Sequence, residues 1–157
     1  MVVKEDISRI IVELHASTIK ARQDAAVRLG KSGDPLAIEA LTMAVSDPHP
    51  AVRREAARAL GRLRDSSALP GLLRALNDGE PVVRAAAIAA LGMIKDRASV
   101  EALIQCLEDQ EMEIRIGAAK VLGKIGDNRA LEPLKALQKD PFTDVRETAD
   151  EAICRLR

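Results

Sequence analysis

The stretch Pro50-Ala-Val-Arg-Arg-Glu-Ala-Ala-Arg-Ala-Leu-Gly-Arg-Leu63 decides the fold, because the chain repeats its pattern every 31 residues. An arginine, a glycine and two aspartates keep this interval over four or five copies. The arginine column is Arg22, Arg53, Arg84, Arg115 and Arg146, and the glycine column is Gly30, Gly61, Gly92 and Gly123. The aspartate columns are Asp34, Asp65, Asp96 and Asp127, and then Asp47, Asp78, Asp109 and Asp140. Such a period is typical of a solenoid, in which each unit buries its apolar face against its neighbours.

Each unit is predicted to contain two helices, here called helix A and helix B. In the second unit, Leu36, Leu41 and Val45 recur with a helical period, which predicts helix A over about 35–46. Asp34 stands ahead of it in the N-cap position. Helix B is predicted over 50–63. The later units predict helix A over about 66–77, 97–108 and 128–139 and helix B over 81–94, 112–125 and 143–156, and the first unit predicts helix A over 4–14.

The predicted fold class is an all-α solenoid of five helical hairpins in a single domain, residues 1–157. The expected repeats are about 1–33, 34–64, 65–95, 96–126 and 127–157. Gly33 and Gly126 are predicted left-handed caps at the ends of helix B, whereas Arg64 and Lys95 at the same place are expected to be strained or to use a different turn.

Composition excludes several classes of function. The formal net charge is zero, with 24 basic and 24 acidic residues, so neither nucleic acid nor an anionic membrane is an expected partner. Cys106 and Cys154 have no metal-site or disulfide spacing and are expected to be reduced thiols, as in a cytoplasmic protein. The first residues carry charges where a signal peptide needs its apolar run. No apolar run is long enough to span a membrane.

The pattern Asp-x-x-x-x-Val-Arg-x-x-Ala-Ala-x-Ala-Leu-Gly-x-Ile-Gly-Asp resembles the short HEAT repeats of the bilin-lyase (PBS lyase) type. This resemblance implies a right-handed α–α superhelix with helix B on its concave side. It also implies a structural ladder of hydrogen bonds between each linker aspartate and the arginine six positions later. The implied pairs are Asp47/Arg53, Asp78/Arg84, Asp109/Arg115 and Asp140/Arg146. Because Ala16 replaces the aspartate of the first unit, the ladder is expected to end there. A partly buried arginine needs such a partner, which favours a structural role.

One face of helix B is predicted to stay free and to bind a protein or peptide. It is basic in the second unit, apolar in the third, mixed in the fourth and acidic in the fifth. The candidate residues are Arg54, Arg58, Arg62, Val82, Ala85, Ala89, Met93, Ile116, Lys120, Glu147 and Glu151. The same face is expected to expose Glu55, Ala86 and Thr148. The alternative interpretation is an ordinary solvated helix surface, since aromatic binding anchors are missing.

Catalysis has little support in the residues. The two histidines, His15 and His49, have no second ligand at metal-site spacing, and Cys106 falls in an apolar core column. No catalytic residue, metal site or cofactor is predicted. The sequence favours a non-enzymatic scaffold or adaptor. Through the resemblance, a bilin-lyase-like subunit or chaperone acting on a chromophore-bearing protein is the alternative. A self-assembling or engineered repeat array is a third reading, and homo-oligomerisation is left open.

Overall fold

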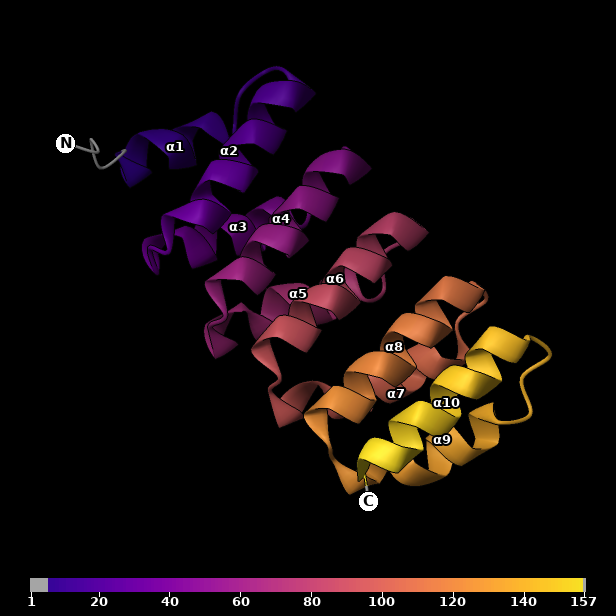
Figure 1. The fold of residues 1–157 in the computed structure, drawn as a ribbon. Coiled ribbons are helices and arrows are strands. Elements are labelled where there is room, and N and C mark those ends of the chain that lie inside the picture. Colours follow the sequence, from indigo (N-terminus) through magenta and orange to yellow (C-terminus); the bar gives the residue numbers. More distant parts are fainter. Residues whose placement is uncertain (1–5, 157) are drawn as a thin grey trace.

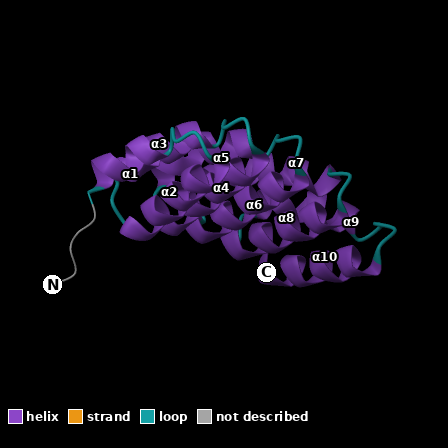
Figure 2. Ribbon diagram, turned by 90° about the horizontal axis from the view of Figure 1, so that it is seen from above, coloured by secondary structure: helices purple, strands orange, loops and turns teal. Residues whose placement is uncertain are grey.

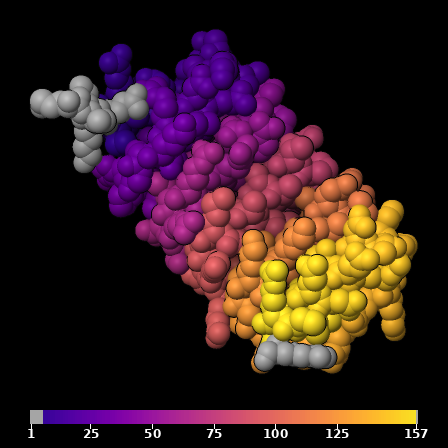
Figure 3. Space-filling model, in the orientation of Figure 1, coloured from indigo at the N-terminus to yellow at the C-terminus, as the bar shows by residue number. Residues whose placement is uncertain are grey.

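The computed structural model describes residues 6–156 as a stack of paired α-helices, without a β-strand in that range. Figure 1 shows the even-numbered helices side by side in one row, with the odd-numbered helices behind them. Figure 2 shows the same two rows as two layers that run the length of the molecule. Helices of different units that pack against each other come from consecutive units. The sequence colours accordingly follow one another in bands in Figure 3. The chain is an all-α solenoid, as predicted.

The back row contains the A helices. They are α1 (Ile7–Glu13), α3 (Leu36–Ala44), α5 (Leu69–Ala75), α7 (Val100–Gln105) and α9 (Leu131–Leu137). In the last three units a 3₁₀ turn comes first, namely η1 (Ser66–Ala68), η2 (Arg97–Ser99) and η4 (Asn128–Ala130), and η3 (Cys106–Glu108) follows α7. Prediction treated each of these segments as one helix. The difference arises because an aspartate caps a tight turn, as where Asp65 accepts from the N–H of Ser67 at 2.8 Å.

The front row contains the B helices, each of 14 residues. They are α2 (Ile19–Ser32), α4 (Pro50–Leu63), α6 (Pro81–Ile94), α8 (Met112–Ile125) and α10 (Thr143–Leu156). The last four match the predicted ranges. After four of these helices the next residue is left-handed: Gly33 and Gly126 have φ of 67° and 71°, and Arg64 and Lys95 have φ of 52° and 58°. The two non-glycine caps therefore make the same turn, at a cost of about 1–2 kcal/mol each.

The core lies between the two rows and consists of aliphatic side chains. Leu60, Leu91 and Leu122 of the B helices are fully buried, as are Leu72 and Leu103 of the A helices. The lone aromatic residue, Phe142, is half exposed instead. Each layer thus repeats the same leucine contacts, and stability comes from neighbouring units.

Glycines set the close spacing of the front row. A Cβ built on Gly61 would lie only 2.6 Å from the Cα of Ala90, and one on Gly30 would lie 2.7 Å from the Cα of Ala59. Real Cβ atoms do not approach so closely, so only glycine permits these helices to pack at this distance. At the two ends of the row the repeat differs. Arg28 of α2 stands where the later units have Ala59, Ala90, Val121 and Ala152. Cys154 of α10 stands where the earlier units have the repeated glycine.

Candidate interaction surface

The predicted binding face lies on helices that run side by side along the front row of Figure 1. Nine of the eleven candidate residues are exposed, and Arg54 and Ile116 are partly buried. On α6 the apolar part of this face includes Val82, which is 51% exposed, and Met93, which is 43% exposed. Ala85 and Ala89 lie between them and are also exposed. The face is accessible to a partner, and its binding role stays a prediction.

Three residues that were expected on this face are buried instead. Glu55, Ala86 and Thr148 are each only 8% exposed. They share one column of the repeat with Gly117, where an added Cβ would lie 3.4 Å from Ile88 of the preceding B helix. This column therefore faces the neighbouring helix rather than solvent, which explains the error.

The buried Glu55 changes the role of two basic residues. Arg54 donates to Glu55 Oε1 from Nε at 3.2 Å and from Nη2 at 3.0 Å, and Arg58 Nη1 lies 3.6 Å from the same oxygen. A buried carboxylate is stable as an anion only when it is paired. Arg54 and Arg58 therefore neutralise part of their own helix, whereas the exposed Arg62 and Lys120 form no ion pair among the described residues.

The arginine–aspartate ladder exists, and each predicted pair is hydrogen-bonded, but only through the backbone carbonyl of the aspartate. The carboxylate partner of Arg53, Arg84 and Arg115 comes instead from the next unit. Arg53 donates to the Asp78 carboxylate from Nε at 2.6 Å and from Nη2 at 2.9 Å. Asp47, six positions before Arg53, accepts only through its backbone carbonyl oxygen, from Nη1 at 3.0 Å. Each carboxylate thus belongs to the next unit, 25 residues later. The four pairs are Arg22–Asp47, Arg53–Asp78, Arg84–Asp109 and Arg115–Asp140.

This pairing also reverses the expected end of the ladder. Arg22 was expected to lack a carboxylate, yet it binds Asp47 through Nε at 2.8 Å. The ladder ends instead at Arg146, which donates to the carbonyls of Asp140 and Pro141 and to Thr143 Oγ1. Within residues 6–156 it forms no ion pair with a carboxylate. Phe142, which follows Asp140, places its ring centroid 5.8 Å from the guanidinium carbon of Arg115 and adds a cation–π contact.

The ladder aspartates are held as anions. Burial opposes ionisation of Asp78, but the hydrogen bond from Arg53 and that from the N–H of Glu80 outweigh it. Together with the charges of Arg53 and Arg84 they keep the pKa of Asp78 below its ordinary value of 3.8. The same balance lowers the pKa of Asp47 and Asp109. These ionised aspartates therefore pair with arginines of the preceding unit and link consecutive units.

The candidate catalytic groups have structural surroundings. The Nδ1 atom of His49 accepts from the N–H of Ala51 and caps α4. Burial raises the pKa of the Cys106 thiol to about 11, and its sulfur donates to the Ala102 carbonyl, which favours the protonated and less reactive thiol at neutral pH. No group of three potential metal ligands occurs among the described residues. Over the same range no helix has the length and apolar character needed to cross a bilayer.

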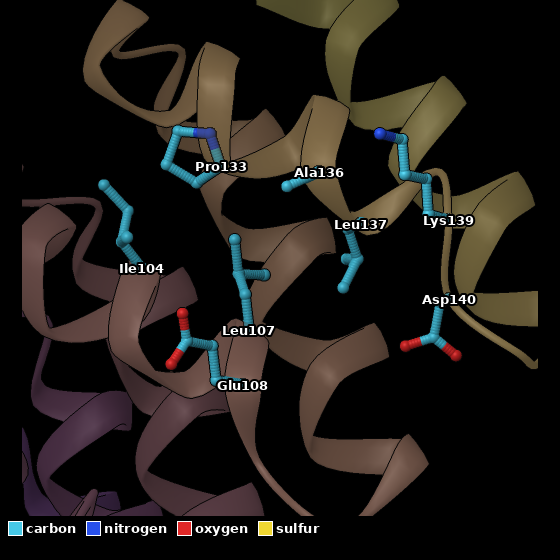
Figure 4. A pocket seen from close by; sticks show the side chains of 8 residues that line it. All are labelled: Ile104, Leu107, Glu108, Pro133, Ala136, Leu137, Lys139 and Asp140. Atoms are coloured by element: carbon cyan, nitrogen blue, oxygen red, sulfur yellow. The ribbon is translucent and has the colours of Figure 1, made fainter.

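Open cavities lie on the side of the helix-A row, where no binding residue was predicted. The one between η3 and α9 has a volume of about 370 Å³ and is lined by Ile104, Leu107, Pro133, Ala136 and Leu137, among others (Figure 4). A corresponding groove of about 190 Å³ lies beside Met43 of α3. One feature of the sequence could have indicated the larger cavity. At the 31-residue interval, the small residue Ala136 takes the place of the larger Val12, Met43, Arg74 and Gln105.

Comparison with known proteins identifies the repeats. A family model described as HEAT repeats matches residues 7–92 and 69–154. A solved complex of CpcE and CpcF of phycocyanin lyase from Nostoc sp. PCC7120 is similar over 97% of this chain and 65% of that one, with 29% identity and a TM-score of 0.82. The chain therefore spans less than two thirds of that protein's length. A search of curated protein sequences returned no match.

Two further solved structures share the fold at lower identity. A designed armadillo repeat protein in complex with the peptide (KR)4 aligns over 96% of this chain and 82% of that one, with 18% identity and a TM-score of 0.73. Human deoxyhypusine hydroxylase aligns over 96% of this chain and 84% of that one, also with 18% identity, and has a TM-score of 0.54.

Proposed function

Because the chain belongs to the HEAT-repeat family, we propose that it is a non-enzymatic scaffold that binds a protein or peptide on its helix-B face. A helical-repeat scaffold fits a role in protein interaction, because stacked units offer a long continuous surface. We infer that the front row is the binding surface from the arrangement of its exposed side chains.

The observation that carries the proposal is the graded character of the helix-B face. Arg62 provides an exposed positive charge on α4, and Val82 and Met93 provide an apolar strip on α6. Glu147 and Glu151 provide exposed negative charge on α10. A partner with the opposite gradient would gain contacts along the whole row, whereas one with a uniform charge would be repelled at one end.

The ladder supports this role by holding the row in a fixed geometry. Each of the four ion pairs joins consecutive units, and the arginine side chains are only 10–18% exposed. A rigid surface loses little conformational entropy when it binds, which favours affinity. The candidate residues therefore project from helices whose relative positions are set in advance.

A capture experiment with two charge-matched variants tests the proposal. The first combines Arg62→Glu with Ala89→Arg on the helix-B face. The control combines Arg9→Glu with Met43→Lys, whose positions are exposed on the helix-A row. Proteins captured by immobilised wild type and identified by mass spectrometry should be lost with the first variant and kept with the control. Equal capture by both variants would remove the helix-B face from consideration.

A bilin-lyase-like role is the second candidate, favoured by the 29% identity with the CpcE–CpcF structure of phycocyanin lyase. In this case the chain would act as a subunit or chaperone on a chromophore-bearing protein. The test is to incubate the purified chain with phycocyanin apoprotein and a bilin, with and without a second lyase subunit. Chromophore that stays attached after denaturation is read by absorbance. If the same amount of chromophore is attached with and without this chain, the role is eliminated.

A further inference from the structure

The cavity between η3 and α9 is suited to an apolar side chain. Its volume of about 370 Å³ falls in the range of small ligand sites. Figure 4 shows Leu107 between Ile104 on one side and Leu137 on the other, with Pro133 and Ala136 of α9 facing them. Leu107 and Leu137 are 5% and 7% exposed, so the cavity reaches the core. An aliphatic side chain placed here would leave water and contact five apolar residues.

The cavity is open because its column of the repeat carries a small residue at this point. In the third unit the equivalent residue is Arg74, which reaches across to the preceding A helix and donates to the Thr42 carbonyl at 2.9 Å. In the fourth unit it is Gln105, and the groove beside it is about 110 Å³. Ala136 has no such side chain. The fifth unit thus has space that its neighbours fill.

An acidic groove adjoins this cavity and shares a residue with it. The groove has a volume of about 390 Å³ and includes Arg84, Asp109, Glu108 and Glu111. Arg84 and Asp109 neutralise each other in the ladder at 2.8 and 2.9 Å. The exposed Glu108 and Glu111 therefore leave a net negative charge. Glu108 lines both cavities and forms no ion pair or side-chain hydrogen bond within residues 6–156.

The far rim of the apolar cavity differs in charge. Asp140 is paired with Arg115, and the neighbouring Lys139 is exposed. Lys139, just beyond the end of α9, and the unpaired Glu108 of η3 thus lie on opposite sides of the apolar cavity (Figure 4). A ligand that enters the apolar cavity from the acidic groove meets negative charge first.

We propose that these two cavities form one docking groove for an extended segment of a partner protein with a bulky aliphatic side chain two residues away from a lysine or arginine. The aliphatic side chain fills the space above Leu107 and Leu137. The basic side chains lie along Glu108 and Glu111. Successive side chains of an extended chain point to opposite sides, so the basic side chain that shares the groove with the aliphatic one belongs to a residue two positions away. Neither cavity is lined by a candidate residue of the helix-B face, so this proposal does not depend on the function proposed for the front row.

Binding of short fluorescein-labelled peptides, measured by anisotropy, tests the proposal. The probe carries one leucine with a lysine two residues before and two residues after it in an otherwise Gly/Ser peptide, and matched peptides replace leucine with serine or lysine with glutamate. Loss of the leucine should weaken binding about tenfold or more, because its burial is lost. Loss of the lysines should weaken binding several-fold and remove its dependence on salt.

Three variants locate the site. Ala136→Gln introduces the residue of the fourth unit and should weaken binding of the leucine peptide about tenfold. Glu108→Lys should weaken binding of the lysine peptide several-fold. Arg62→Glu on the front row should change neither. Amide and methyl NMR shifts caused by the probe should centre on Ile104, Leu107 and Ala136.

Each contrary result overturns the proposal in a distinct way. If no peptide binds at millimolar concentration, or if Ala136→Gln binds as wild type does, the cavity is not a docking site. Loss of binding only in Arg62→Glu would assign the peptide to the helix-B face. If the same NMR shifts arise on concentrating the protein alone, with a rise in molecular mass, a second copy of the chain is the occupant.

Discussion

Arg53 on α4 binds the carboxylate of Asp78 through two hydrogen bonds, at 2.6 and 2.9 Å, and thereby joins two consecutive units. The third donor, Nη1, reaches back to the carbonyl of Asp47 in its own linker at 3.0 Å. One guanidinium thus fixes two linkers at once. Because both side chains are largely buried, at 18% and 10% exposure, the pair is not a screened surface contact.

Removal of one member of this pair should lower the stability of the fold. Asp78→Ala leaves the Arg53 charge partly buried without its carboxylate, and should lower the free energy of unfolding by about 3 kcal/mol. The matched control is Arg146→Ala, which removes the ladder arginine that has no carboxylate partner among the described residues. Its cost should be about 1 kcal/mol. Urea unfolding followed by circular dichroism measures both, and equal losses would mean that the carboxylate contributes little.

The ladder should also make stability depend on acid pH. The pKa values of Asp47, Asp78 and Asp109 are lower in the folded chain than the ordinary value of 3.8. Their contribution is therefore complete above that value and is lost as the pH falls through the folded pKa values. The urea midpoint should fall between about pH 5 and about pH 2. In Asp78→Asn the fall should be smaller, and an identical pH profile would contradict the role assigned to this carboxylate.

The glycine column should tolerate no added methyl group. In Gly61→Ala the new Cβ would lie 2.6 Å from the Cα of Ala90, so α4 and α6 must separate. We expect a loss of about 1–3 kcal/mol, as for an overpacked core. Gly117→Ala is the control, because its Cβ would lie 3.4 Å from an Ile88 methyl, at the lower end of ordinary van der Waals contact. There the better helix propensity of alanine should leave stability unchanged or raised by up to about 1 kcal/mol. Thermal unfolding compares the two, and an equally tolerated Gly61→Ala would refute the spacing argument.

The two cysteines should differ in reactivity. Cys106 is buried with its pKa raised to about 11, whereas Cys154 is exposed on α10. A chromogenic disulfide reagent at neutral pH should therefore modify one thiol per native chain within minutes and the second only after unfolding. Mass spectrometry of the labelled peptides identifies which thiol reacted. Early modification of Cys106 would indicate that η3 opens readily.

The fold was predictable because the residues that determine it, such as the buried leucine and the glycine of each B helix, recur at the same position in several units. Leu60 and Gly61 belong to columns whose spacing identifies the buried side of every B helix. The direction of a short side chain is not visible in this way. Asp78 lies six positions before Arg84 and 25 after Arg53, and only the backbone path of the linker decides that its carboxylate faces Arg53.

The candidate surfaces were less predictable, for a related reason. Glu55 resembles a solvated helix residue, but the neighbouring B helix covers it and two arginines clamp it. The cavity at Ala136 depends on what a small residue leaves unfilled between two units. A pattern of residue types records which side chains are apolar, but it does not record the volume between them.

The interruption of the glycine and alanine columns at the two ends of the front row bears on filament growth. Inside the stack, a glycine of one B helix meets a residue no larger than valine in the next: Gly30, Gly61 and Gly123 meet an alanine, and Gly92 meets Val121. If a second copy were placed end to end in the same register, Cys154 of one molecule would meet Arg28 of the other. Neither has the small size that this contact demands, and Arg28 is already engaged with Glu13. This contact therefore opposes end-to-end continuation of the repeat from one copy of the chain to the next.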